Sequence, residues 1–218
     1  MTLVAFDFDG VLTASDLTVA LGREYDWENE IQGLADQSRR GDVDFADSLR
    51  QRVSLLEGMP EPRVDRAFET VKLRKGVPEL LGALQRSDVE VAIVTAGFER
   101  GVRSVLDRAG VAVDHLVANR LLVANGALTG EVEGPLVEGG KDRALEEVAV
   151  AAGVDIDRTI VVANDARDVP MLRLAGTAIC YEPEPLAERF CDVVVTSVTN
   201  LRLYLEQHGV IEAEAEPR

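Results

Sequence analysis

The sequence opens with Met1-Thr2-Leu3-Val4-Ala5-Phe6-Asp7-Phe8-Asp9-Gly10-Val11-Leu12-Thr13, an apolar run that ends in two closely spaced aspartates. The run has the length and composition of a buried strand. Two carboxylates separated by one residue at the end of such a strand cannot both carry a charge without a cation or a shared proton. A hard cation such as Mg²⁺, which prefers oxygen ligands, would satisfy both. One carboxylate could then attack phosphorus while the other transfers protons; the alternative is a pair of loop aspartates that cap a helix.

From Gly76 onwards, strand-sized apolar runs alternate with helical patterns. Repeated strand–helix units imply a parallel sheet with helices on both faces. The dipeptide Asn125-Gly126 between two short apolar runs predicts a two-residue hairpin. The predicted buried strands of this part are Val89–Val94, Thr159–Ala163, Thr177–Tyr181 and Asp192–Thr196.

A helical block separates the first two predicted strands. Phe45, Leu49, Val53 and Leu56 recur at helical spacing behind Asp42 or Asp44 as a cap. A block of this length is too long for a loop. We therefore predict an α/β fold, a Rossmann-like parallel sheet core with a small helical cap inserted after the first strand: residues 1–14 and 75–218 form the core and residues 15–74 form the cap.

The composition is strongly acidic, with a formal net charge of −16 over 218 residues. Such a surface repels nucleic-acid backbones and anionic membranes, so we expect neither as a partner. The chain contains only three lysines, at positions 72, 75 and 141. An acidic, lysine-poor surface is typical of a salt-adapted protein, because carboxylates stay hydrated at high ionic strength. The alternative is an ordinary acidic enzyme from a high-GC genome.

The apolar runs also bear on the compartment. The longest are strand-sized and too short to cross a bilayer, and the N-terminal stretch lacks the basic flank and apolar block of a signal peptide. We therefore expect a cytoplasmic protein. Cys180 and Cys191 fit no metal-binding spacing and need not pair in a reducing compartment. After about Val210 we expect a terminal tail without catalytic residues.

Polar residues follow the predicted strands at the points where ligands bind in an open parallel sheet. Thr95 follows the second strand and offers a hydroxyl donor beside the amides of a helix start; the alternative is an ordinary helix cap. Asn164, Asp165 and Asp168 follow the strand that ends at Ala163.

Lys141 opens a predicted helix that runs to Ala152. A compact ammonium suits a point contact with both a phosphate and Asp7. The alternative is a solvated lysine at a helix start, where the helix dipole makes a cation unfavourable. This mismatch favours a functional role.

At these positions the sequence resembles the haloacid dehalogenase superfamily, whose first motif is Asp-x-Asp-x-[Thr/Val]. Within it the sequence is most similar to the phosphoserine phosphatase group, which carries a small helical cap after the first motif. The resemblance covers nearly the whole chain. It rests on Asp7–Thr13, Val94–Phe98, Lys141 and Asn164–Leu172, and on the further stretches Asp44–Leu56 and Ala118–Gly130.

The resemblance implies a role for each residue of the site. Asp7 is the nucleophile and Asp9 the acid and base. Mg²⁺ is held by Asp7, the carbonyl of Asp9, Asn164 and, through water, Asp168. On the phosphate side of a substrate the residues are Thr95, Lys141, Ala96, Gly97 and Arg167. On the other side, Asp16 would bind an ammonium, Arg52 would bind a carboxylate and Phe45 would form an apolar wall.

Asp16 and Arg52 also have simpler interpretations. Asp16 could be a helix cap, and Arg52 could be a surface arginine on an amphipathic helix, as nearby Arg50 is expected to be. A planar guanidinium can grip a carboxylate with two hydrogen bonds, which is why the resemblance gives this role to Arg52.

The fourth motif departs from the family pattern Gly-Asp-Gly-x-Asn-Asp. Asn164 takes the position of a metal-binding aspartate, which lowers the charge of the site and is expected to weaken Mg²⁺ binding. Asp165 could take over by a slip of one residue, but its spacing to Asp168 is then wrong, which favours Asn164. Arg167 replaces an asparagine, and Arg39 stands where the family tends to have an apolar residue.

The sequence therefore predicts a Mg²⁺-dependent phosphatase that hydrolyses O-phospho-L-serine. The altered cap and Arg167 leave open a phosphatase or phosphotransferase for another small phosphorylated metabolite. Asn164 leaves open a catalytically weakened phosphate-binding or regulatory protein, although intact Asp7 and Asp9 speak against it.

Overall fold

The computed structural model describes residues 1–212, so most of the tail expected after Val210 lies outside the described residues. Its centre is one seven-stranded sheet in the order β4-β3-β2-β1-β5-β6-β7. All neighbouring strands are parallel except β3 and β4. The predicted α/β class with a largely parallel sheet is confirmed. The strands are β1 (Thr2–Phe6), β2 (Val89–Phe98), β3 (His115–Ala124), β4 (Ala127–Glu133), β5 (Thr159–Ala163), β6 (Thr177–Tyr181) and β7 (Val193–Val195).

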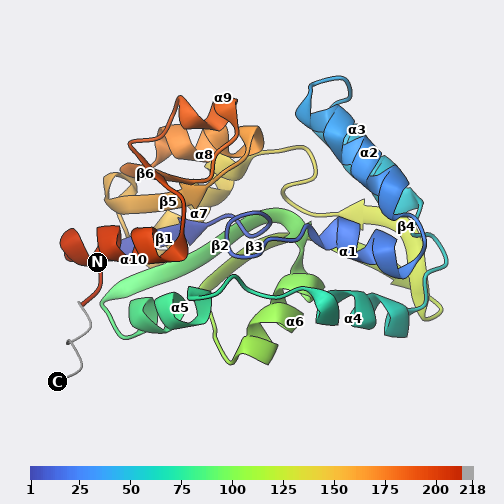
Figure 1. Cartoon of the computed structure of the whole chain (residues 1–218), viewed down its shortest axis with the longest axis horizontal. Coiled ribbons are helices and arrows are strands. Elements are labelled where there is room, and N and C mark those ends of the chain that lie inside the picture. Colours follow the sequence, from blue (N-terminus) through green and yellow to red (C-terminus); the bar gives the residue numbers. More distant parts are fainter. Residues whose placement is uncertain (213–218) are drawn as a thin grey trace.

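Helices cover both faces of this sheet (Figure 1). Alternate residues of the buried strands point to opposite faces, so Val4 and Phe6 pack into one hydrophobic core and Leu3 and Ala5 into the other. The first core includes α5 (Val77–Gln85), α6 (Glu99–Ala109) and α10 (Val198–Gln207); the second includes α7 (Lys141–Ala152), α8 (Val169–Leu174) and α9 (Pro185–Glu188). Two 3-10 turns, Ile156–Arg158 and Ala166–Asp168, flank β5.

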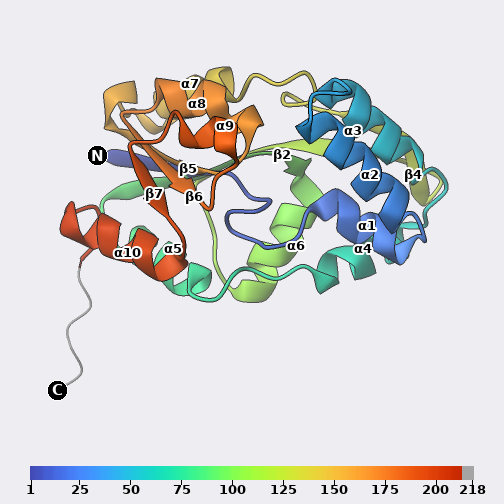
Figure 2. The ribbon, with the colours of Figure 1, turned by 45° about the horizontal axis from the view of Figure 1, so that its top comes forward.

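Five helices stand between β1 and β2, and the four that precede α5 lie to one side of the sheet (Figures 1 and 2). These four are α1 (Leu17–Glu24), α2 (Glu28–Arg39), α3 (Phe45–Ser54) and α4 (Glu61–Thr70). Asp44, rather than Asp42, caps α3, because its side chain accepts hydrogen bonds from two backbone N–H groups of the first turn.

The β3–β4 hairpin reaches from the sheet to these helices. Its two turn residues are Asn125 and Gly126, both with positive φ (53° and 78°), which confirms the predicted hairpin. Leu128 of β4 exchanges backbone hydrogen bonds of 2.9 Å with Gly58 and Met59, in the loop between α3 and α4. The hairpin thus supports the helical block, a contact that the sequence pattern did not predict.

One strand boundary differs from the prediction. β2 continues past Val94 to Phe98 with an irregular register opposite β3. Thr95 therefore lies within the irregular end of β2, and Phe98 rather than Thr95 is the cap residue of α6. The extension agrees with burial, because Val94 before the irregular part and Phe98 after it are both fully buried.

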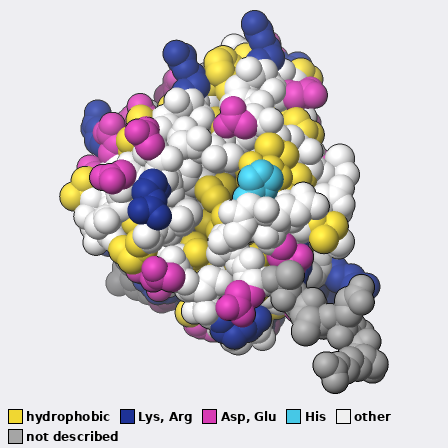
Figure 3. Space-filling model, turned by 90° about the vertical axis from the view of Figure 1, so that its left-hand side faces the viewer, with side chains coloured by type: hydrophobic (Ala, Val, Ile, Leu, Met, Phe, Trp, Pro, Cys, Tyr) yellow, Lys and Arg dark blue, Asp and Glu magenta, His cyan; other side chains and the backbone are white. Residues whose placement is uncertain are grey.

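On the face shown in Figure 3, acidic and basic side chains are interspersed with hydrophobic ones, and neither sign forms one continuous patch. Across residues 1–212, none of the helices combines the length and the apolar character that spanning a membrane requires.

Candidate active site

A small cavity of about 20 Å³ lies where the carboxyl ends of β1 and β2 meet α3. Parallel strands bring their carboxyl ends to one edge of the sheet, so residues far apart in sequence meet there. Ten residues predicted for the site line this cavity: Asp7, Asp9, Asp16, Phe45, Arg52, Thr95, Ala96, Gly97, Lys141 and Arg167. Thr18 and Leu49, which the sequence did not single out, complete the lining.

Asp7 is held by a buried ion pair on the core side of the cavity. Its backbone N–H donates to the carbonyl of Val162 on the neighbouring strand (2.9 Å), which fixes its position at the end of β1. Lys141 Nζ donates to Asp7 Oδ1 (2.8 Å) and to Asp168 Oδ1 (2.5 Å). All three side chains are at most 6% exposed. The ammonium therefore offsets one of the two negative charges and donates to both carboxylates, which could not be buried together without it.

The pKa values in this triad follow from burial. Burial, followed by the nearby charge of Asp168, raises the pKa of Asp7 to about 6, although Lys141 opposes the shift. Burial acts to lower the pKa of Lys141, but the carboxylates of Asp168 and Asp7 outweigh it and raise the pKa above its ordinary value. The lysine therefore stays charged, as a group that contacts a phosphate should.

Asp9 lies on the side of the cavity toward α1. Its Oδ1 accepts a hydrogen bond from the N–H of Leu17 (3.2 Å). Burial, then the charges of Asp16 and Asp7, raise its pKa well above the ordinary value. A carboxyl group whose pKa is raised holds its proton more readily, which suits general acid catalysis.

The turn after Thr95 lies close to Asp9. The N–H of Gly97 donates to Thr95 Oγ1 (3.0 Å). A Cβ atom at Gly97 would lie 3.0 Å from Asp9 Oδ2 and 3.2 Å from Thr95 Oγ1. The cavity therefore requires a residue without a side chain at this position.

The cap helices supply the opposite wall. Asp16 caps α1 through hydrogen bonds from the N–H groups of Thr18 (2.7 Å) and Val19, and its Oδ2 lies 3.9 Å from Arg52 Nη1. Asp16 is thus both a helix cap and the ion-pair partner of a buried arginine. Arg52 is only 3% exposed, which excludes the interpretation as a surface arginine. The guanidinium groups of Arg52 and Arg167 lie 5.9 and 4.8 Å from the centre of the Phe45 ring.

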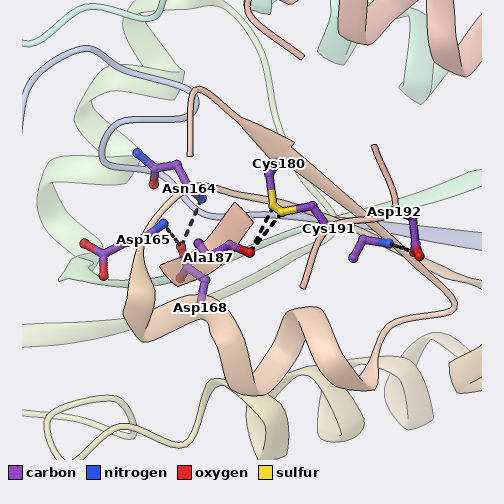
Figure 4. Close-up of a disulfide and its surroundings, with 8 residues drawn as sticks. Asn164, Asp165, Asp168, Cys180, Ala187, Cys191 and Asp192 are labelled. Atoms are coloured by element: carbon purple, nitrogen blue, oxygen red, sulfur yellow. Dashed lines mark hydrogen bonds between the residues drawn. A yellow bond between two sulfur atoms is a disulfide. The ribbon is translucent and has the colours of Figure 1, made fainter. Parts of the chain in front are cut away.

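The loop after β5 places its charged residues differently (Figure 4). Asp168 Oδ2 accepts hydrogen bonds from the N–H groups of Asn164 (3.2 Å) and Asp165 (3.0 Å). Asp165 pairs instead with Arg167, whose Nε donates to it at 2.7 Å. Burial acts to raise the pKa of Asp165, but Arg167 outweighs it and lowers the pKa to about 2. Asp165 is therefore engaged with Arg167.

Asn164 has the features of a metal ligand. Among the described residues, its Oδ1 is buried without a hydrogen-bond partner. The side chain lies against Gly10, where a Cβ atom would be 2.4 Å from Asn164 Nδ2. No three His, Cys, Asp or Glu side chains within residues 1–212 form a metal cluster. An unpartnered amide oxygen beside buried aspartates with raised pKa values nevertheless suits a hard cation.

Comparison with known proteins decides the family. Residues 4–173 match the family model for haloacid dehalogenase-like hydrolases. The chain belongs to the haloacid dehalogenase-like hydrolases. The resemblance found in the sequence motifs is thereby confirmed.

This hydrolase is similar to curated relatives over almost its full length. A phosphoserine phosphatase from Halobacterium salinarum is 43% identical over 210 residues, which cover 96% of this chain and all of the relative. A phosphoserine phosphatase from Methanocaldococcus jannaschii is 32% identical over 88% of this chain and 91% of the relative.

Solved structures agree with the sequence comparison. A substrate-bound phosphoserine phosphatase complex matches with a TM-score of 0.87 at 30% identity and covers 94% of this chain and 97% of that one. A phospho-aspartyl intermediate analogue of phosphoserine phosphatase matches with a TM-score of 0.86 at 30% identity over 93% of this chain and 98% of the other.

The cysteines are paired in this hydrolase, although the sequence gave no reason to expect pairing. Cys180 of β6 and Cys191 form a disulfide with Cα atoms 5.7 Å apart (Figure 4). The connection from β6 to β7 folds back through α9, and this return brings Cys191 to the end of β6. Such closeness depends on the tertiary path of the connection and not on the spacing of the two residues.

Arg74 is another residue of the site region that the sequence did not reveal. It lies just after the helical block, and its Nη2 donates to the carbonyl of Gly10 (2.9 Å) in the first-motif loop. Its guanidinium lies 4.7 Å from the centre of the Tyr181 ring at the end of β6. Arg74 thus links the loop that carries Asp9 to the end of β6.

Proposed function

We propose that this hydrolase cleaves O-phospho-L-serine to L-serine and phosphate. The observation that carries the proposal is one cavity lined both by the buried Asp7–Lys141 pair and by buried Arg52 with its half-buried partner Asp16. The first pair suits a phosphate and the second suits the ammonium and carboxylate of an amino acid. The similarity to phosphoserine phosphatases over nearly the whole chain supports the same substrate.

Asp7 acts as the nucleophile and forms an aspartyl-phosphate as the P–O bond to serine breaks. Asp9, whose pKa is raised by burial and by the charges of Asp16 and Asp7, donates its proton to the departing serine oxygen. It then accepts a proton from the water that hydrolyses the aspartyl-phosphate. Lys141 and Thr95, with the N–H groups of Ala96 and Gly97, hold the phosphate oxygens.

The residues that would hold Mg²⁺ are Asp7, the carbonyl of Asp9 and Asn164, with Asp168 acting through water. When bound, the cation neutralises charge on the phosphoryl group. Asp168 also keeps Lys141 and the loop in place through the hydrogen bonds already described.

Residues 15–74 act as a cap over a core made of residues 1–14 and 75–218. With the cap in the position described, the catalytic cavity of about 20 Å³ adjoins a larger cavity of about 470 Å³. Arg52 and Arg167 line both cavities. Closure of the cap would exclude bulk water and let Asp16 and Arg52 select the amino acid.

A second candidate is the hydrolysis of another small phosphorylated metabolite. The larger cavity favours it, because Arg39, Arg52 and Arg167 all line a space that exceeds the needs of serine. A panel of small phosphate esters separates the two candidates. If an ester without an amino group is hydrolysed as fast as phosphoserine, Asp16 and Arg52 do not select the substrate.

The test is phosphate release from phosphoserine with Mg²⁺ varied, in low and in high potassium chloride, beside Asp7→Asn. Turnover that requires Mg²⁺ and disappears in the variant supports the proposal, and turnover that persists in high salt supports salt adaptation. Release only from other esters keeps the chemistry and rejects the substrate. No release from any ester favours a phosphate-binding or regulatory protein.

A further inference from the structure

Glu184 joins three parts of the molecule that surround the candidate site. It lies in the connection between β6 and β7, immediately before α9, and is half-buried. Its N–H donates to the carbonyl of Asn164 (2.8 Å), and its Oε2 accepts a hydrogen bond from the N–H of Ala166 (3.4 Å). Its Oε1 lies 3.7 Å from Nε of Arg39 at the end of cap helix α2.

These contacts hold the loop of the proposed metal ligand from outside. Within the loop, the Asp168 carboxylate accepts hydrogen bonds from the N–H groups of Asn164 and Asp165, and Asp165 pairs with Arg167. The connection that carries Glu184 is closed into a loop by the Cys180–Cys191 disulfide, and both sulfur atoms contact the carbonyl of Ala187 in α9 (Figure 4). A cross-linked loop of this kind has less freedom to move, so the backbone that carries Glu184 is restrained.

The contact with Arg39 reaches across the boundary between cap and core. Arg39 and Glu184 are 37% and 32% exposed, so solvent screens the ion pair and its energy is small. Both ends of the pair nevertheless lie beside the larger cavity: Arg39 lines it, and so do Asp165 and Ala166 of the loop that Glu184 holds. A cap that moves Arg39 therefore acts directly on the residue that supports Asn164.

We propose that Glu184 is a positioning residue that couples the cap, through Arg39, to the loop that carries Asn164. This inference rests on the proposed function. In the structure, one oxygen of Glu184 accepts a hydrogen bond from the N–H of Ala166 and the other faces Arg39. The position of the cap and the placement of the metal ligand therefore depend on the same carboxylate. Residues that orient a metal ligand from outside commonly alter metal affinity when they are removed.

The experiment uses variants that separate the two contacts. Glu184→Gln keeps an acceptor for the N–H of Ala166 and loses the charge that attracts Arg39. Glu184→Ala loses both contacts, and Arg39→Gln loses the cap contact together with the ion pair between Arg39 and Asp36 on the same helix. Glu188→Ala is the matched control, because Glu188 lies one helical turn further along α9 and is exposed.

Two readouts are needed. The first is the Mg²⁺ concentration that gives half of the metal-induced rise in melting temperature, which requires no activity. The second is KM for phosphoserine, with 4-nitrophenyl phosphate as a generic ester. The generic ester shows whether a variant without phosphoserine turnover still has the chemistry, so failure of the proposed substrate is distinguished from failure of this inference.

We expect Glu184→Ala to require about 10-fold more Mg²⁺. Glu184→Gln and Arg39→Gln remove the cap side of the coupling, so each should raise KM by about 2- to 5-fold and the required Mg²⁺ by a similar factor, which is less than Glu184→Ala does. The double variant Arg39→Gln/Glu184→Gln should be no worse than either single variant, because both remove one pair. Unchanged Mg²⁺ dependence in folded Glu184→Ala, additive effects in the double variant, or a wild-type protein whose melting temperature does not respond to Mg²⁺ would each overturn the proposal.

Discussion

The core wall and the cap wall of the site are held by different kinds of contact. On the core wall, Asp7, Lys141 and Asp168 form ion pairs whose side chains are at most 6% exposed. At the tip of the cap, Arg50 and Glu138 are paired with side chains 49% and 71% exposed. Separating a buried ion pair costs a large free energy, whereas separating an exposed pair costs little. The core wall is therefore suited to fixed chemistry, and the exposed contact between cap helix α3 and the core is suited to opening and closing.

The other edge of the cap resembles the core wall more than the tip. Arg108 of α6 donates to the carbonyls of Phe68 (3.1 Å) and Val71 (2.6 Å) at the end of α4. Arg100 of α6 also pairs with two acidic residues of α4. If the cap moves, these contacts restrict the movement to the tip formed by α2 and α3.

Lys141→Met tests the fixed core wall and should have the largest effect. It leaves Asp7 and Asp168 without a counter-ion, so we expect kcat to fall about 10³-fold and stability to fall by about 3–5 kcal/mol. Phosphate release and urea unfolding measure the two effects. Lys72→Met is the control, because Lys72 is exposed. A variant with near-normal kcat would show that Lys141 is only a structural cation.

The pH dependence of the metal-free protein tests the same wall without a substrate. Since the pKa of Asp7 is raised to about 6, the folded protein binds a proton that the unfolded chain releases near pH 4. The stability from this group is full below about pH 4 and is lost as the pH rises toward 6.

Asp7→Asn should remove this loss, so the variant gains up to about 3 kcal/mol relative to wild type between pH 4 and pH 7. Urea unfolding in a chelator at several pH values measures the difference. Asp107→Asn, at an exposed position, should show no such trend. Parallel profiles for wild type and Asp7→Asn would mean that Asp7 keeps its ordinary pKa.

Arg52→Ala tests the selective part of the cap wall. The loss of charged hydrogen bonds to a substrate carboxylate should raise KM for phosphoserine about 10- to 100-fold. Hydrolysis of 4-nitrophenyl phosphate, which lacks that carboxylate, should change little. Equal losses on both esters would show that Arg52 supports the fold of the cap and does not read the substrate.

Asn164→Asp tests the one weak point of the core wall. A restored carboxylate should lower the Mg²⁺ concentration for half-maximal activity about 10-fold. Asp165→Asn is the matched comparison and should leave the Mg²⁺ dependence unchanged, because Asp165 pairs with Arg167. The opposite pattern would make Asp165 the ligand. A Mg²⁺ titration of phosphate release decides between them.

Arg50→Ala tests the exposed ion pair at the tip of the cap and should have the smallest effect. Its exposed pair with Glu138 should contribute about 0–1 kcal/mol, so KM should change less than about 5-fold. KM at low and high salt measures it. A larger, salt-independent effect would contradict the division between a fixed core wall and a loosely held tip.

The sequence by itself determined the fold class, the order of the elements and the chemistry-bearing residues. Apolar runs of strand length set the sheet, Asn125-Gly126 set the hairpin, and the spacing of Asp7 and Asp9 pointed to a charged site, because these features depend on local composition and periodicity. The motif order then led to the family, which the family match confirmed.

Tertiary structure alone decided which charges face one another. The pairing of Cys180 with Cys191 and the contact of Glu184 with Arg39 join segments whose distance apart is set by packing. The local fold of the loop after β5 decides that Asp165 pairs with Arg167 and that, among the described residues, Asn164 Oδ1 has no partner. The sequence gives the type of each charged side chain. Its burial and its partner depend on how the sheet, the cap and the loops pack around it, and burial and partner determine its pKa and its role.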